Sequence, residues 1–293
     1  THLIGIGEVT IKVNPSSSSY IALKPHLDGT ETGYDGVYNT TIENIIFDGQ
    51  NGTNAYGLFA TAHCKNITLK KCTFLNLKNS WHMVEINSSY NTLLEDCTFE
   101  GYNVDVSDDI NHTEAVQLDF AGGNSNYPFT CNFDGTGVEK VTFKRCTFEH
   151  ITTSATGAIG SHSLSDISMP RDILVEDCTF KDVDICIYAP DYYNFKANRN
   201  EIYNCGIFMV YYTTSDQSPG GVTLRDNHYN GLLRVKKGEG RFFDHRGYTN
   251  QLKDIVIENN IILNAGTHGI GVTPLVGSIE RNLVRNCTKN GIY

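Results

Sequence analysis

Two carboxylates and one imidazole, groups that enzymes use for proton transfer, occupy related positions in three similar segments of the chain. They are Glu85, Asp119 and His162. Hydrolysis of a glycoside needs two carboxyl groups, and a separation of about 6.5–9.5 Å leaves room for a water and implies inversion. We therefore name Asp119 as the candidate general acid, Glu85 as the candidate base, and His162 as a residue that orients or binds the substrate.

The segments around these residues alternate apolar and polar side chains, which is typical of a strand with one face in a core. If their apolar residues align, the outward positions form two columns: Glu85, Gln117 and Gly160, then Asn87, Asp119 and His162. Rungs of a sheet lie about 4.8 Å apart and alternate residues of a strand about 6.6 Å apart, so the two carboxylates would be about 8 Å apart. A register error of one residue would turn all of them inward.

Further polar and aromatic residues near these strands are candidates for substrate binding. They are Gln117, Glu114, His112, Asn87, Tyr188, Arg171, Arg234 and Lys236. A tyrosine can serve as a platform for a sugar ring, and the cations can hold a carboxylate. Each residue also has a structural interpretation: Glu114 and His112 could bond the backbone of a turn, and Arg171 could brace a loop.

The elements that must position these residues belong to a repeat. Copies of one nine-residue template end at Phe47, Phe74, Phe99, Phe148 and Phe180, and weaker copies end at Ile202, Tyr229, Ile262 and Val284. Two or three short β-branched strands per repeat, separated by Asn, Asp and Gly turns, predict an all-β protein, a right-handed parallel β-helix of about nine to ten coils. A leucine-rich repeat would need a Leu consensus, and a propeller blade about 40 residues.

Equivalent residues of successive coils should stack into internal ladders. One ladder contains Cys72, Cys97, Cys146 and Cys178, continued by Asn200, Asn227 and Asn260. Four of the nine cysteines thus occupy one repeat position, where a small apolar side chain explains them, so we expect free, buried thiols. No CxxC pair occurs, and we predict no metal site.

Insertions interrupt the repeat at about 101–111, 121–137 and 164–171, and a charged, aromatic one is predicted over 236–248. Binding residues gather on loops that a rigid scaffold carries, so these insertions are expected to be the walls of a groove. We interpret 1–293 as a single domain. Because open ends of a parallel stack are adhesive edges, we expect it to be part of a longer polypeptide, or to be covered by further domains or by a homo-oligomer such as a trimer.

Charge and hydropathy exclude two classes of partner. The formal net charge is −10, whereas a nucleic-acid binder would show a basic stripe. No apolar run approaches the length that spans a membrane. A polysaccharide is compatible with both observations and is the partner we expect.

The repeat Asn66-Ile-Thr-Leu-Lys-Lys-Cys-Thr-Phe74 resembles the repeats of the pectate-lyase-like superfamily of right-handed β-helix proteins. Within it, the segments 114–119 (Glu-Ala-Val-Gln-Leu-Asp) and 160–162 (Gly-Ser-His) resemble segments of uncharacterised β-helix proteins of Gram-positive bacteria and their phages. The resemblance implies an extracellular, virion or cell-surface location. Hydrolases, lyases, epimerases and phage tailspikes share this fold, so function must be argued from the site.

Three functions remain open. The first, which we favour, is a glycoside hydrolase that uses the paired carboxylates and needs no cofactor. The second is a polysaccharide lyase, which would remove a proton beside a uronate carboxylate with a cationic or tyrosyl base, often with Ca²⁺. The third is a non-catalytic glycan-binding module of a phage tail or an adhesin.

Overall fold

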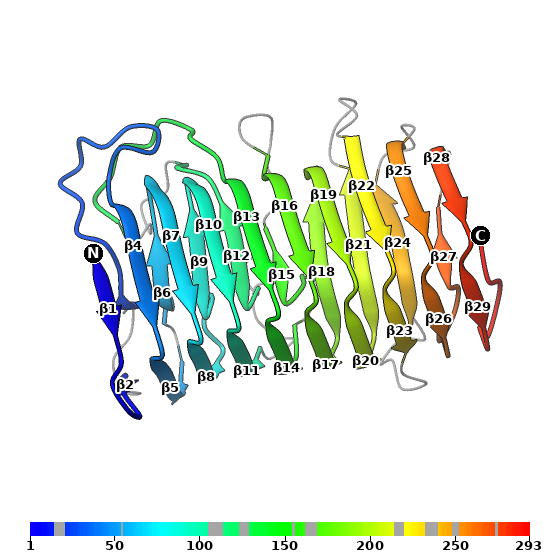
Figure 1. The fold of residues 1–293 in the computed structure, drawn as a ribbon, viewed down its shortest axis with the longest axis horizontal. Helices are drawn as coiled ribbons and strands as arrows, with labels where there is room; N and C mark the ends of the chain where they lie inside the picture. The colour runs from blue at the N-terminus through cyan, green and yellow to red at the C-terminus, as the bar shows by residue number, and fades with distance from the viewer. Residues whose placement is uncertain are drawn as a thin grey trace.

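Three parallel sheets run side by side along one long axis and wind into a β-helix (Figure 1). The structure is a computed structural model that describes residues 1–14, 21–53, 55–104, 114–122, 129–153, 156–161, 169–213, 220–231, 240–247, 252–272 and 275–293. Within these residues, two sheets have 10 strands and the third has 9. The predicted fold class and coil number are confirmed.

Each coil contributes one strand to each sheet, except that the last coil, with β28 and β29, has no described strand in sheet C. Sheet A contains β1 (His2–Ile4), β4 (Tyr38–Glu43), β7 (Cys64–Lys70), β10 (Ser89–Glu95), β13 (Glu139–Lys144), β16 (Arg171–Glu176), β19 (Tyr193–Asn198), β22 (Gly220–Arg225), β25 (Leu252–Glu258) and β28 (Leu275–Glu280). Sheet B contains β2 (Thr10–Lys12), β5 (Ile46–Gly52), β8 (Thr73–Lys78), β11 (Thr98–Asn103), β14 (Thr147–Ile151), β17 (Thr179–Val183), β20 (Glu201–Cys205), β23 (His228–Gly231), β26 (Ile261–Leu263) and β29 (Leu283–Arg285). Sheet C contains β3 (Ile21–Leu23), β6 (Gly57–Thr61), β9 (Val84–Asn87), β12 (Val116–Asp119), β15 (Ile159–Gly160), β18 (Ile185–Pro190), β21 (Ile207–Thr213), β24 (Arg241–Gly247) and β27 (Ile270–Gly271).

The corner between sheets A and B is a tight turn that one left-handed residue makes in each coil. Asn and Asp tolerate this conformation well, which explains why they punctuate the repeat. The residues at this corner are Asn44, Lys71, Asp96, Arg145, Asp177, Arg199, Asp226, Asn259 and Arg281. Lys and Arg here show that position in the repeat, and not residue preference alone, sets the turn.

The core consists of ladders, as the repeat predicts. The five phenylalanines from Phe47 to Phe180 stack face to face, with ring centroids 4.8 to 5.1 Å apart. The cysteine column is buried and all of its thiols are free. From Asn200 onward the column consists of asparagines in place of cysteines. The Oδ1 of Asn200 accepts a hydrogen bond from the backbone N–H of Cys178 at 2.9 Å. Asn227 and Asn260 repeat this contact, and Asn282 extends the series.

Three details of the repeat differ from the pattern that its spacing suggests. The predicted insertion over 236–248 is wrong over 241–247, which forms β24 beside β21 in sheet C. Its Phe242 and Phe243 are fully buried, so a strand with a buried centre was concealed among charged residues. Gly231 ends β23 and does not open a strand of sheet C. The stretch before β4, which carries no copy of the nine-residue template, holds β3.

Both ends of the stack carry exposed apolar side chains. Ile6 is 92% exposed at one end, and Tyr293 is 68% exposed at the other. In the part of the chain that the structure describes, no helix has the length and apolarity to cross a membrane.

Candidate functional site

The predicted register of the candidate strands is confirmed. In sheet C, Glu85 of β9 pairs with Gln117 of β12, and Asn87 pairs with Asp119. Gln117 pairs in turn with Gly160 of β15. The column continues through Tyr188. His162, and with it His112, Arg234 and Lys236, lies outside the described residues.

The outward face at these strands is not a groove open to solvent, contrary to the expectation. Glu85 is only 3% exposed, and Gln117 and Asn87 are as deeply buried. Asp119, at the end of β12, is partly buried. Alternation along the strands correctly predicted which face of the sheet each side chain occupies. The exposure of that face depends on the segments that pack over it.

Two segments before sheet A strands cover this face at the first coils. Phe129 and Cys131 form an apolar cluster with Leu27 over the outward Ala60 and Ala62. Ala60 is the register neighbour of Glu85. Phe129 and Cys131 therefore form a lid over the rung next to Glu85 in this column, and not the wall of a groove.

A buried histidine joins the two covering segments. The Nδ1 of His63 lies 2.8 Å from the carbonyl oxygen of Gly33, and its Nε2 lies 2.8 Å from that of Asn132. The backbone N–H of Gly33 also donates to the Asp134 carboxylate at 2.8 Å. Because both carbonyl oxygens only accept, both His63 bonds form together when the ring carries both protons. We call this arrangement the His63 clasp.

Burial raises the pKa values of both candidate carboxyls. For Glu85 the pKa rises to about 8, because burial comes first and the charge of Asp119 adds to it; a hydrogen bond from Asn87 Nδ2, at 3.2 Å, opposes the rise. For Asp119 burial raises the pKa to about 7, opposed by the N–H of Phe120 at 2.8 Å. Burial therefore favours the protonated form of Glu85, which does not suit the role of base predicted for it.

A second buried carboxyl, that of Glu114, lies beside Gly160 of β15. Glu114 is fully buried, and its Oε2 lies 3.7 Å from the Nδ1 of the buried His82. The same Nδ1 lies 3.0 Å from the Glu114 carbonyl oxygen. A Cβ on Gly160 would come within 2.9 Å of the Glu114 Cγ, so the glycine leaves the space in which Glu114 lies. Glu114 thus has a clear packing role, in addition to any role in binding.

The two remaining described candidates lie in different places. Tyr188 stands in the Glu85 column and stacks near Tyr212, with centroids 6.3 Å apart. Burial, followed by the neighbouring Tyr212, raises the pKa of Tyr188 to about 12. Arg171 begins a strand of sheet A, where its Nε lies 3.7 Å from Glu139 Oε1. Arg171 is therefore not on the same face as Glu85.

Sequence reasoning missed a charged group in the same column. Tyr188 pairs with Val210, and Val210 pairs with Asp244 of β24. Asp244 therefore lies two rungs beyond Tyr188 in this column of sheet C. It is 2% exposed and forms ion pairs with Arg241 and, at 2.7 Å, with Arg246. The available signal was the pair of adjacent aromatic residues, Phe242 and Phe243, which the surrounding charged residues obscured.

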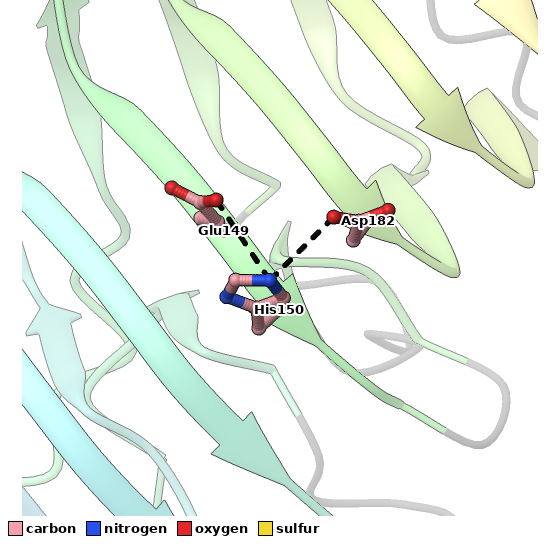
Figure 2. A group of neighbouring side chains, drawn as sticks. All are labelled: Glu149, His150 and Asp182. Atoms are coloured by element: carbon pink, nitrogen blue, oxygen red, sulfur yellow. Dashed lines mark ion pairs between the residues drawn. The ribbon is translucent and has the colours of Figure 1, made fainter.

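One group of described residues has the geometry to hold a metal ion, although no metal site was predicted. Figure 2 shows Glu149, His150 and Asp182, whose ligand atoms lie within 4.8 Å of one another. His150 Nε2 is 3.8 Å from Glu149 and 3.5 Å from Asp182. Lys181 already forms an ion pair with Glu149. Because the imidazole is also 54% exposed, ordinary surface ion pairing accounts for this group.

Comparison with solved structures shows the fold of this chain in other proteins. A crystal structure of PfbA, a surface adhesin of Streptococcus pneumoniae, matches with a TM-score of 0.63 and 15% identity, over 100% of this chain and 79% of that one. A second structure of PfbA gives 0.61 and 16%, over 100% and 86%. The catalytic domain of a GH87 alpha-1,3-glucanase in complex with nigerose gives 0.36 and 9%, over 88% and 49%, too low to support an argument.

Sequence comparison gives the family. Among curated proteins, none matches this chain. A family model described as "Right handed beta helix region" matches residues 132–293, which is more than half of the sequence. Together with the three parallel sheets, this match establishes the handedness and the relationship. The chain belongs to the right-handed β-helix family.

Proposed function

We propose that this protein is a non-catalytic glycan-binding module of a cell surface or virion. The observation that carries the proposal is the burial of Glu85. An inverting hydrolase needs two carboxyl groups that both face the bond to be cleaved. Here the carboxyl beside Asp119 is 3% exposed, with its pKa raised to about 8. A β-helix without such a pair remains a rigid surface on which a polymer can bind.

Two further observations support binding without cleavage. The solved structures with a TM-score above 0.6 are named as a surface adhesin, although at 15–16% identity their likeness concerns the fold. In addition, burial raises the pKa of Tyr188 to about 12, which makes it a poor tyrosyl base for a lyase. The cell-surface location is part of the same proposal.

A panel of bacterial surface and plant polysaccharides tests this proposal. Binding to each immobilised polymer is measured together with released reducing ends and the absorbance of unsaturated uronate. We expect binding to at least one polymer with neither product. Reducing ends alone would identify a hydrolase, both products a lyase, and either result would overturn the proposal. Failure to bind any polymer would overturn it as well.

A glycoside hydrolase is the second candidate, and the raised pKa of Asp119 favours it. A carboxyl that is partly buried and has a pKa of about 7 is suited to proton transfer near neutral pH. Asp119→Asn keeps the size of the side chain and removes its charge. A catalytic Asp119 would then lose several orders of magnitude in rate with unchanged folding, whereas a structural one would alter only the melting temperature.

A further inference from the structure

The first outward position of sheet A forms a continuous column over six coils. Its register pairs join these residues in order: Tyr38, Lys65, Tyr90, Glu139, Arg171 and Tyr193. Lys140 follows Glu139 directly. We call Tyr38, Lys65, Tyr90, Lys140, Arg171 and Tyr193 the tyrosine stripe. With rungs about 4.8 Å apart, the stripe extends over about 24 Å of the helix axis.

The two ends of the stripe are exposed aromatic rings. Tyr38 is 56% exposed and Tyr193 is 55% exposed, which is unusual for large side chains on a rigid sheet. Among the described residues of the next coil, Gly220 is the one in register with Tyr193, because Phe195 pairs with Val222 two residues later. Because glycine has no side chain, Gly220 does not cover the ring. Such rings can pack against the apolar C–H face of a sugar.

The middle of the stripe supplies cations that the tyrosines hold in place. The Nζ of Lys65 lies 5.5 Å from the centroid of Tyr38, and that of Lys140 lies 4.7 Å from the centroid of Tyr90. Lys140 also donates to the Tyr90 hydroxyl. These cation–π contacts restrict the ammonium groups and so reduce the entropy lost when a ligand binds. Arg171 is half-exposed beside Glu139.

The local charge of the stripe differs from that of the molecule. Three cations face two carboxylates, Glu139 and Asp172, and Asp172 accepts a hydrogen bond from Asn194. The chain as a whole has a formal charge of −10. A polyanion would therefore be repelled by most of the surface and attracted at this stripe.

We propose that the tyrosine stripe binds an extended acidic polysaccharide, one that carries uronic-acid carboxylates, along the axis of the β-helix. This inference rests on the proposed glycan-binding function and states where the glycan lies and what charge it carries. Sugar rings stack on Tyr38 and Tyr193, and carboxylates of the intervening units pair with Lys65, Lys140 and Arg171. A guanidinium can receive a carboxylate through two parallel hydrogen bonds.

The test measures binding of the full chain to immobilised polygalacturonate and hyaluronan, with dextran as the neutral polymer and single-stranded DNA as a different polyanion. We expect binding to an acidic polysaccharide that weakens with added salt, and weak or no binding to dextran and DNA. Tyr38→Ala and Tyr193→Ala should each weaken binding about tenfold, as losses of aromatic anchors do. Melting temperatures confirm that each variant folds.

Matched variants separate the stripe from the rest of the surface. Lys140→Gln should weaken binding about threefold, a typical loss for an exposed ion pair. Lys71→Gln removes an equally exposed lysine with the same left-handed backbone, φ 50° against 55°, and should bind like the original protein. Tyr203→Ala removes a tyrosine that is 38% exposed on sheet B, and should also leave binding unchanged.

Each outcome decides a specific point. If acidic polysaccharides bind but the stripe variants bind equally well, this inference is wrong while the proposed function stands. Equal binding to dextran would overturn the charge class, and equal binding to DNA would overturn the polysaccharide as ligand. If none of the polysaccharides in this and the earlier panel binds, the proposed function fails and this inference fails with it.

Discussion

Two outward-facing columns of the same β-helix have opposite environments. Glu85 on sheet C and Tyr193 on sheet A both point away from the core by register. Yet Glu85 is 3% exposed and has a raised pKa, whereas Tyr193 is 55% exposed. The difference arises from the segments over sheet C, which the His63 clasp joins. Strand register thus sets direction, while the segments between strands set access to water.

The largest expected effect concerns the covered column. The folded-state pKa of Glu85 is raised to about 8 from an ordinary value of 4.5, so the native state retains a proton that the unfolded state releases. Stability should therefore fall as pH rises from about 4.5 to 8 and remain low above that. Glu85→Gln should remove this loss, on the order of a few kcal/mol, and be more stable than the original protein at pH 9. Urea unfolding across pH 4–9 measures it.

Glu95→Gln, on sheet A of the same coil, is the control with the opposite sign. A hydrogen bond from Arg145 lowers the pKa of Glu95, so its contribution is present at neutral pH and lost as the pH falls. Its neutral variant should be slightly less stable at pH 7. A Glu85→Gln variant with the same pH dependence as the original protein would show that Glu85 is hydrated and the column open.

A second prediction concerns the His63 clasp that joins the covering segments. His63→Ala removes the two His63 bonds to the covering segments, leaves the bond between Gly33 and Asp134, and should cost about 1–3 kcal/mol. The amides of residues 25–36 and 129–137 should then exchange hydrogen faster, while those of sheet B should not. Because Glu85 would regain water, its pKa should fall toward 4.5. Unchanged exchange in both segments would mean that the apolar cluster around Phe129 holds the lid without the clasp.

A third prediction concerns the space under the cover. Gly160→Ala places a Cβ 2.9 Å from the Glu114 Cγ and 3.2 Å from the Tyr188 carbonyl oxygen, and should cost about 1–3 kcal/mol. Gly271→Ala is its control in the same column, since its nearest atoms would lie at 3.6 Å. Thermal unfolding compares the two. Equal melting temperatures would contradict the tight packing of Glu114 over Gly160.

The smallest expected effect lies at the open column. Tyr193→Ala should change the free energy of unfolding by no more than about 0.5 kcal/mol, because more than half of the side chain is already in water. Urea unfolding measures this with the variant made for the binding test. A loss above about 2 kcal/mol would show that the ring is packed, and the contrast between the two columns would then disappear.

The sequence predicted the ladders and the register because they depend on local spacing. Val84 aligns with Val116 since each coil repeats the same apolar positions, and no distant contact is needed to deduce this. The cover over Glu85 depends on contacts such as His63 with Asn132, 69 residues apart. Their residues carry no periodic signal. The strand 241–247 was missed for a related reason. Asp244 forms ion pairs with both Arg241 and Arg246, so the strand carries a density of charge that is more typical of a solvated loop.

The two-residue strand β15 has a mechanical consequence. Pulling along the helix axis loads the hydrogen bonds between rungs, and the bonds of one rung share the force. β15 shares two register pairs with β12 and two with β18, whereas β21 and β24 share six. In the same coil β13 and β16 share five pairs in sheet A, so sheets A and B would bear most of the tension there. Under tension, sheet C should part first at the rung where Glu114 crosses Gly160, while the tyrosine stripe on sheet A keeps its spacing.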